Sequence, residues 1–441
     1  MTSTETIPTP QPAHGSGQES TFPTWARALV AVAALYLFIA AVKMIGGGLK
    51  VMAKDPAGQD FIDWLFSFVH DPFTGLFVGL LITSLVQSSS FTTSMVVGFV
   101  GAQALTEGDS GPLLSVSDAI PIIMGANIGT SITGLLVSLG RLRHRDEFRR
   151  SLAAAICHDF FNLLSVLLFF PLEVKFGVIS RPILWLKTKL SGNAVFAEKP
   201  TEHIGFIKEF LGYPSAFMKT MLTKWFHIDA IPSGAIMAIL AMVLLFVALG
   251  LLVKMLRGLV QGKLSNVFSK TLFYNGATAF VVGILMTVSV QSSSVTVSLI
   301  VPLVGAEVLN LVQVYPYLLG ANIGTTMTAM LAALAIAGPG GPPAIACACG
   351  HLLFNIYGTA VFWPLKSLPL GLAKWFGDLA ARKRYLAILY IVGLFFLLPG
   401  GILGVMKYTG HLQTNETQTP QETTIMNDGA TDVHTDTPVA P

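Results

Sequence analysis

The chain has 441 residues, of which 53% are hydrophobic and 12% charged, and its formal net charge is +3. The charged share is about half of what soluble proteins carry, which excludes a soluble domain, and the small charge spread over loops argues against a nucleic-acid partner. The three cysteines, Cys157, Cys347 and Cys349, lie in apolar stretches and imply neither a disulfide framework nor a transition-metal site.

Long apolar windows with few or no charges recur along the chain. Examples are residues 28–45, 122–139, 152–171, 236–253 and 386–405. Each is long enough to cross ~30 Å of hydrocarbon as a helix. The sequence therefore predicts an all-α polytopic membrane protein, whose partners include the lipid bilayer. The polar residues 1–24 and the Thr-rich, acidic residues 409–441 are predicted to be disordered tails.

Between the tails, the same motifs occur twice in the same order. Gln-Ser-Ser-Ser occupies residues 87–90 and 291–294, and Gly-Ala-Asn-Ile-Gly-Thr occupies 125–130 and 320–325. A His-x-x-x-Asn pair occurs at His158 and Asn162 and again at His351 and Asn355. The difference in residue number between matching positions is 204 for the Gln-Ser-Ser-Ser motifs, 195 for the Gly-Ala-Asn-Ile-Gly-Thr motifs and 193 for the His–Asn pairs. The first copy is therefore longer than the second, and most of its extra residues lie in the loop 107–117. This order indicates an internal duplication.

The duplication divides the chain into segments. Residues 25–173 form the first transmembrane repeat and residues 233–366 the second. The polar residues 174–232 between them are predicted to be extracytoplasmic. Residues 367–408 are predicted to contain an amphipathic segment and the last transmembrane helix.

Basic residues predict the orientation of these segments in the cell membrane. They cluster in the loops 141–150, 254–270 and 382–384, which the positive-inside rule places in the cytoplasm. The helices carrying the two Asn-containing motifs then cross in opposite directions, so the repeats are inverted. Because the number of crossings between loops on the same side must be even, each segment with a Gln-Ser-Ser-Ser motif has to enter and leave the membrane from one side. Each motif is then the tip of a re-entrant helical hairpin near the midplane. Such a break in a helix is tolerated only where it lines a cavity or is buried in protein. With seven further spans, the C-terminus lies outside if the N-terminus lies inside.

The motifs offer neutral oxygen and N–H groups, because residues 73–140 and 271–338 contain no Lys or Arg. Hydroxyl, amide and carbonyl oxygens without carboxylates favour a monovalent cation over calcium. The serines also open the second helix of each hairpin, where backbone N–H groups and the helix dipole favour an anion. A dianion entering a negative-inside cell faces ~4.6 kcal/mol per 100 mV, so co-bound cations are expected, and sodium symport follows as a hypothesis.

The motifs resemble the type II sodium-dependent phosphate cotransporter family. The stretches that carry the resemblance are QSSSFTTSMVV, IMGANIGTSITGLLVSL, FRRSLAAAICHDFFNLLSVLLFFPLE, QSSSVTVSLIVPLVGAE and YPYLLGANIGTTMTAMLAALA, within residues 78–173 and 276–364. The resemblance implies a bacterial-like symporter that couples import of inorganic phosphate to Na+, without another cofactor, by alternating access in which a substrate-carrying unit moves against a scaffold, as in an elevator. It also implies that the paired motifs bind phosphate and sodium. The residues so implied are Gln87, Ser88, Ser89, Ser90, Gln291, Ser292, Ser293 and Ser294, with Asn127, Thr130, Asn322 and Thr325 as supporting ligands.

One departure from the family concerns stoichiometry. Electrogenic vertebrate members carry Ala-Gly-Asp before the Arg-x-x-Phe-Arg-Arg segment, and that Asp supports an additional sodium ion. Here the aligned residue is His144. The number of sodium ions per phosphate therefore stays open, as do the oligomeric state and which serine contacts which ion.

Other interpretations stay open at this point. The serines and threonines could mediate helix packing, and the Gly-Ala-Asn-Ile-Gly-Thr motifs could be close helix crossings. The His–Asn pairs could be satisfied interhelical hydrogen bonds, or could serve proton coupling with Asp159 as the one supporting neighbour. Another oxyanion could be the cargo, or the protein could be an anion channel. A serine hydrolase would need His158 or His351 as its base, and no enzyme activity is expected.

Overall fold

The computed structural model describes residues 23–52, 54–58, 60, 69, 71–103, 114–191, 212–267, 275–336 and 338–408. All regular elements within these ranges are helices. The predictions for the tail residues 1–22 and 409–441, and for most of the insertion at 107–117, lie outside the described residues.

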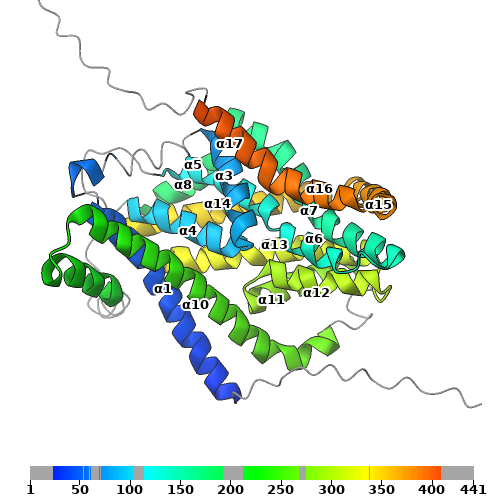
Figure 1. The fold of residues 1–441 in the computed structure, drawn as a ribbon, viewed down its shortest axis with the longest axis horizontal. Coiled ribbons are helices and arrows are strands. Elements are labelled where there is room, and N and C mark those ends of the chain that lie inside the picture. Colours follow the sequence, from blue (N-terminus) through cyan, green and yellow to red (C-terminus); the bar gives the residue numbers. More distant parts are fainter. Residues whose placement is uncertain are drawn as a thin grey trace, which may run out of the picture.

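The helices follow one another along the whole described chain (Figure 1). They are α1 (Thr24–Met52), α3 (Pro72–Val86), α4 (Ser89–Gln103), α5 (Val116–Gly129), α6 (Ile132–Leu139), α7 (Arg145–Phe176), α8 (Ser180–Ser191), η2 (Met221–Trp225), α10 (Ala230–Val267), α11 (Gly276–Val290), α12 (Ser293–Gly305), α13 (Leu311–Leu334), η3 (Gly338–Gly340), α14 (Gly341–Phe362), α15 (Ser367–Arg382), α16 (Tyr385–Val392), η4 (Gly393–Leu397) and α17 (Leu398–Tyr408).

Seven spans among the described residues are long and apolar enough to cross a membrane. They are formed by α1, α5 with α6, α7, α10, α13, α14, and α16 with η4 and α17. The prediction of an all-α polytopic membrane protein is therefore confirmed. Helices α3, α11 and α12 are apolar but shorter. Helix α15 buries one face, including Leu370, Ala373 and Phe376, and exposes Lys374 and Asp378, as an amphipathic segment does.

Two segments that the sequence analysis treats as loops are largely helical. Residues 254–267 of the basic segment 254–270 continue α10, and residues 145–150 are the first turns of α7. Residues 174–232 contain α8 and a further helical stretch at residues 212–225. The reason is that Lys and Arg are good helix formers, so a charge cluster marks the end of a hydrophobic span without ending the helix.

Two helix–break–helix units repeat the same construction. Asp71 caps the N-terminus of α3 through a 2.7 Å hydrogen bond from the Thr74 amide, and Asn275 caps α11 through a 3.0 Å bond from the Ala277 amide. Each first helix ends at a glutamine, and the second helix begins two residues later, at Ser89 in α4 and at Ser293 in α12. The motif spacing alone places these breaks correctly.

Each first helix packs closely against the helix that carries the Gly-Ala-Asn-Ile-Gly-Thr motif, α3 on α5 and α11 on α13. A Cβ atom at Gly125 would lie 1.9 Å from the carbonyl oxygen of Leu76, and one at Gly320 would lie 2.0 Å from that of Phe280. Only glycine permits such an approach of two backbones. The interpretation of these motifs as close helix crossings is therefore confirmed.

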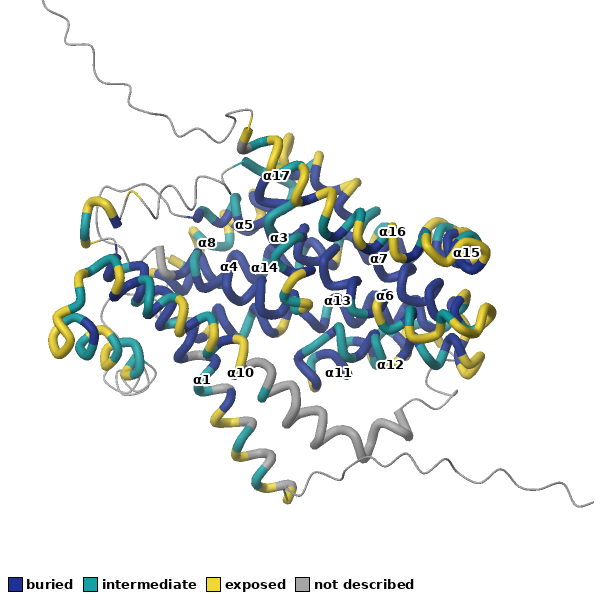
Figure 2. The backbone as a smooth tube through the Cα atoms, in the orientation of Figure 1, coloured by how far each residue is buried: buried dark blue, intermediate teal, exposed yellow. Residues whose placement is uncertain are grey.

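Helices α1 and α10 form a long pair along one side of the molecule (Figure 1), in contact at Gly48 and Gly234. The buried residues concentrate in the centre, on helices that include α5, α7, α13 and α14 (Figure 2). Large apolar side chains such as Leu167, Leu285 and Leu397 are exposed on the outside, as expected of a surface that faces lipid.

We expect Gly125→Ala to destabilise the protein by about 1–3 kcal/mol, because the added methyl group forces α3 away from α5. The measurement is the melting temperature of the detergent-solubilised protein. The matched control is Gly371→Ala in α15, where no atom lies within 4 Å of the added Cβ, so stability should stay equal or rise. Equal melting temperatures for the two variants would contradict the close crossing.

Candidate functional site

The backbone turns at the two glutamines that precede the serines. Gln87 has φ 55° and ψ 30°, and Gln291 has φ 56° and ψ 27°, both in the left-handed region. This conformation costs a residue with a side chain about 1–2 kcal/mol. Non-glycine residues held in it concentrate at functional sites, where the surrounding packing imposes the strain.

The first serine of each motif caps the helix that follows. Ser88 Oγ accepts a 3.2 Å hydrogen bond from the Phe91 amide, and Ser292 Oγ accepts a 3.4 Å bond from the Val295 amide. The first N–H groups of α4 and α12 have no acceptor within their own helices. The N–H groups of the next serines therefore point out of the two helix ends, where the helix dipole adds a partial positive charge.

The two motifs, about two hundred residues apart in sequence, meet in space. The Ser90 hydroxyl lies 3.4 Å from the carbonyl oxygen of Gln291, to which it donates. Ser89, Ser90, Gln291 and Ser293 are buried. Ser88, Ser292 and Ser294 are half-buried, and Gln87 is exposed. The structure thus brings one residue of the first motif, Ser90, into contact with one residue of the second, Gln291.

Paired threonines join the two helices of each unit just below the turn. Thr83 and Thr92 link α3 to α4 through their hydroxyls at 2.9 Å, and Thr287 and Thr296 link α11 to α12 at 3.0 Å. All four are buried. Because both hydroxyls of a pair are satisfied inside the unit, the threonines hold the helices together and leave the serines for other partners.

A second group of polar residues crosses the interface between the repeats. We call His158, Asn162, Asn127 and Asn322 the asparagine belt. His158 Nε2 lies 2.7 Å from Asn322 Oδ1, and Asn322 Nδ2 donates to Asn162 Oδ1 at 2.8 Å. Asn162 Nδ2 donates to the Asn127 carbonyl at 2.9 Å. The belt ties α7 to α5 and α13, so the interpretation of the first His–Asn pair as interhelical hydrogen bonds is confirmed, while His158 Nδ1 is buried without a partner among the described residues.

Thr130 and Thr325, which follow the asparagines in the two motifs, are buried and bonded locally. Each hydroxyl donates to the carbonyl four residues earlier, of Ala126 and Ala321, at 2.9 Å. The proton of each hydroxyl is therefore occupied, and each oxygen remains available as an acceptor for a cation.

The two repeats differ in which of these contacts they form. In the second repeat, Thr328 Oγ1 donates to Gln291 Oε1 at 2.9 Å, whereas the hydroxyl of its mate Thr133 is buried without a partner among the described residues. His158 is bonded to Asn322, whereas neither ring nitrogen of its mate His351 has a hydrogen-bond partner among the described residues.

The asparagine mates differ in the same way. Asn162 and Asn322 bond to each other, whereas the residues at the matching positions, Asn355 and Asn127, donate to carbonyl groups of their own helices. Asn127 Nδ2 donates to Ile123 at 3.0 Å, and Asn355 Nδ2 donates to His351 at 3.2 Å. The interhelical hydrogen bonds inferred from the sequence are thus formed by the first His–Asn pair only.

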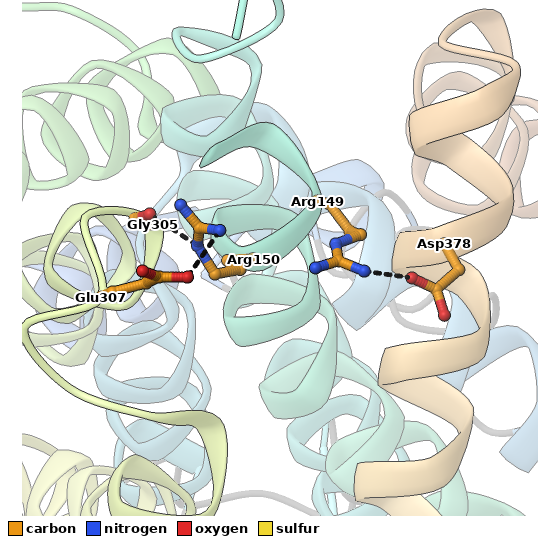
Figure 3. A network of polar contacts seen from close by, with 5 residues as sticks. All are labelled: Arg149, Arg150, Gly305, Glu307 and Asp378. Carbon is orange, nitrogen blue, oxygen red and sulfur yellow. Dashed lines mark hydrogen bonds and ion pairs between the residues drawn. The ribbon is translucent and has the colours of Figure 1, made fainter. Parts of the chain in front are cut away.

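His144 and the basic residues after it lie away from the serines, at the start of α7. His144 occupies the N-cap position, is exposed, and makes no side-chain capping bond. Arg150 pairs with Glu307 at 2.8 Å and donates to the Gly305 carbonyl at 2.9 Å, and Arg149 pairs with Asp378 at 3.3 Å (Figure 3). These arginines connect α7 to the end of α12 and to α15, a structural role.

Sequence reasoning missed Thr328, Ser131 and Tyr390. Thr328 bonds to a motif glutamine, Ser131 lies 3.4 Å from Asn162 Nδ2, and Tyr390 bonds to Asp159. The repeat offset could have found Thr328, since Thr133 occupies the matching position. Tyr390 lies in the last span, outside both repeats, and no sequence signal links it to α7.

We expect Asn322→Ala to destabilise the protein by about 2–4 kcal/mol, because it leaves polar groups of both His158 and Asn162 buried without a partner. Thermal unfolding in detergent measures the effect. Thr326→Ala on the same helix is the control: its hydroxyl bonds only to the Ile323 carbonyl, so a change below about 1 kcal/mol is expected. Similar losses in both variants would show that the belt adds nothing beyond a local hydrogen bond.

Comparison with known proteins identifies relatives of this chain. The chain is 32% identical to sodium-dependent phosphate transport protein 2B of Pongo abelii (86% of this chain, 65% of the relative). It is 34% and 36% identical to transport protein 2A of Rattus norvegicus and Mus musculus (84% and 85% of this chain, 66% and 67% of the relatives). The chain thus spans about two thirds of the length of these relatives. No solved structure matches significantly. Residues 37–173 and 244–397 match the Na+/Pi-cotransporter family, to which this chain belongs.

Proposed function

We propose that this protein is a symporter of the cell membrane that imports inorganic phosphate together with Na+, and that it is not an enzyme. One observation carries the proposal: the hydroxyl of Ser90, at the N-terminus of α4, donates to the carbonyl of Gln291, at the turn between α11 and α12, within chain segments that contain no Lys or Arg. Membership of the Na+/Pi-cotransporter family, and the printed names of the relatives, support the choice of phosphate and sodium.

The meeting helix ends suit a small oxyanion. Two helix dipoles, free backbone N–H groups and the hydroxyls of Ser89, Ser293 and Ser294 offer donors from both repeats, while the Ser90 hydroxyl donates to the Gln291 carbonyl. A tetrahedral anion with several acceptor oxygens can bond to both ends at once. Because the donors are neutral, the bound anion keeps its charge inside a low-dielectric protein, which is costly unless cations bind with it.

Sodium ions supply that charge. Hydroxyl, amide and carbonyl oxygens are ligands that a monovalent hard cation accepts, and the motif glutamines with Asn127, Thr130, Asn322 and Thr325 provide them close to the serines. Moving a divalent phosphate into a negative-inside cell costs about 4.6 kcal/mol per 100 mV, which inward sodium offsets. The anion site has no basic side chains, so sodium must supply the positive charge, and this is why phosphate and sodium transport are coupled.

The topology that fits this function has inverted repeats with re-entrant hairpins. If the basic segments face the cytoplasm, seven spans require the α3–α4 unit to lie on the outer side and the α11–α12 unit on the cytoplasmic side. Both tips then reach the midplane from opposite faces, where carriers with inverted repeats bind their cargo.

Alternating access is supported by the difference between the repeats. Thr328 bonds to Gln291 whereas Thr133 is unpaired, and His158 bonds to Asn322 whereas His351 is unpaired among the described residues. In a carrier with inverted repeats, exchanging the two conformations produces the opposite-facing state. The present contacts would then break, and their mates would form in an elevator-type movement against the α1–α10 pair.

We expect Ser89→Ala and Ser293→Ala each to lower sodium-dependent phosphate uptake at least tenfold while the protein remains folded. Uptake is measured in proteoliposomes with an inward Na+ gradient. In parallel samples, K+ replaces Na+ or sulfate replaces phosphate. Ser138→Ala is the control, because this buried hydroxyl donates only to the Leu135 carbonyl of its own helix and should leave uptake near normal. Equal uptake in K+ would exclude sodium coupling, and preferred uptake of sulfate would exclude phosphate as the main cargo.

We expect Thr328→Val and Thr133→Val to shift the conformational equilibrium in opposite directions, each about fivefold, because each removes a hydrogen bond of about 1 kcal/mol from one state. The readout is the rate at which an impermeant maleimide labels a cysteine introduced at the exposed Leu85, as Leu85→Cys, with Gln87 kept and the native cysteines replaced. A shift in the same direction in both variants would argue against exchange between the repeats.

A further inference from the structure

A cavity of about 370 Å³ lies at the end of the molecule where α7 begins. It is bounded by α7, by α15 and by the segment that joins α12 to α13. Three cations line it, Arg149 and Arg150 of α7 and Lys374 of α15, together with the carboxylates of Glu307 and Asp378. The lining therefore carries an excess of positive charge.

The two arginines extend to opposite sides (Figure 3). Arg150 pairs with Glu307 at 2.8 Å, and Arg149 pairs with Asp378 at 3.3 Å. Both carboxylate side chains are largely exposed, 70% for Glu307 and 54% for Asp378. Ion pairs exposed to this degree contribute little to stability, so another anion can replace either carboxylate at small cost. Phosphate is such an anion, because its oxygens accept the same paired hydrogen bonds from a guanidinium group as a carboxylate does.

Lys374 is the cation of this cavity that has no carboxylate of its own. It is exposed, and it has no ion-pair partner among the residues that the structure describes. It lies one helical turn before Asp378 on α15, so its ammonium group borders the same cavity as the Arg149 guanidinium. Two cations that share a single carboxylate leave room for one more negative group.

The rest of the lining is largely apolar. Val304 at the end of α12, and Leu309 and Leu311 around the start of α13, form a wall of buried side chains. Next to Lys374, the side chain of Trp375 is 60% exposed on the outside of α15. Exposed tryptophan beside basic residues is typical of the membrane–water interface. A free inorganic anion gains nothing from an apolar wall, whereas the glycerol group and acyl chains of a phospholipid do.

This cluster of cations belongs to one end of the molecule only. The positions of the second repeat that match Arg149 and Arg150 are Pro342 and Pro343, so the duplication does not reproduce it. The basic residues 382–384 lie at the end of α15, which packs against α7. If these basic segments face the cytoplasm, the cavity lies at the leaflet whose anionic lipids attract basic side chains.

We propose that this cavity binds the phosphate group of an anionic phospholipid, with Arg149, Arg150 and Lys374 as its ligands and the apolar wall against the rest of the lipid. The bound lipid connects α7 with α15 and competes with Glu307 for Arg150. Because Glu307 directly follows α12, the lipid acts on the end of the second hairpin. The proposal goes beyond the proposed transport function and does not depend on it, since lipid binding is measured without sodium or phosphate.

Native mass spectrometry of the purified protein in detergent counts bound lipids during titration with phosphatidylglycerol or phosphatidylcholine. We expect one phosphatidylglycerol to bind more tightly than all others, with no such preference for phosphatidylcholine. Arg149→Gln combined with Lys374→Gln should weaken this lipid at least tenfold, because two of the three cations are lost. The matched control is Arg143→Gln combined with Lys383→Gln, which removes two exposed cations outside the cavity and should leave binding unchanged.

A variant with the opposite effect separates lost binding from a damaged fold. Asp378→Asn removes the carboxylate that competes for Arg149, so phosphatidylglycerol should bind about three- to fivefold more tightly. Unchanged or weaker binding in Asp378→Asn, or equal weakening in the two double variants, would overturn the proposal. Inorganic phosphate and glycerol 3-phosphate, added at the concentration of the lipid, should not displace it, because they have no acyl chains. Displacement by either compound would assign the cavity to a soluble anion and exclude the lipid.

Discussion

The constraint behind this structure is that polar groups in a membrane interior need partners within the protein. Water is absent from the hydrocarbon, so each unpaired N–H, carbonyl or hydroxyl costs several kcal/mol. The helix breaks at Gln87 and Gln291 free backbone groups at that depth. They are tolerated because serine caps, threonine pairs and the contact between the two tips enclose them in protein. The unsatisfied N–H groups that remain are those which an anion can use.

Close helix packing brings those groups into position. Gly125 and Gly320 let α5 and α13 approach α3 and α11 to backbone contact, which fixes each hairpin on the helix that carries its Asn-containing motif. The asparagine belt then joins the two repeats through α7. The same residues exist in both repeats but only one set of contacts is formed, and in the alternating access proposed above this packing is one of two related arrangements. Such a pair of arrangements is what a carrier with inverted repeats needs.

The distribution of charged residues bears on how an anion and cations could bind together. Paired arginines lie at the start of α7, where they connect helices. The interior contains neutral donors for an anion, and in the middle of α7 the buried carboxylate of Asp159 is bonded to Tyr390. A site without fixed positive charge can bind its anion tightly only when cations are present, and release both when they leave. In the symport proposed above, coupling therefore depends on the residues that the site lacks as well as on those it contains.

The sequence by itself determined the helical membrane class, the duplicated motifs and the position of both helix breaks, because hydrophobic length and local backbone preference act over a few neighbouring residues. It misjudged residues 254–267, since basic residues end a span without ending a helix. It left open which polar residues meet. Only the tertiary structure decided that Ser90 contacts Gln291 and that Tyr390 bonds to Asp159, because such pairs depend on how helices distant in sequence pack. The same reason explains why identical motifs differ in their contacts: neighbours from the rest of the fold determine which side chains find partners.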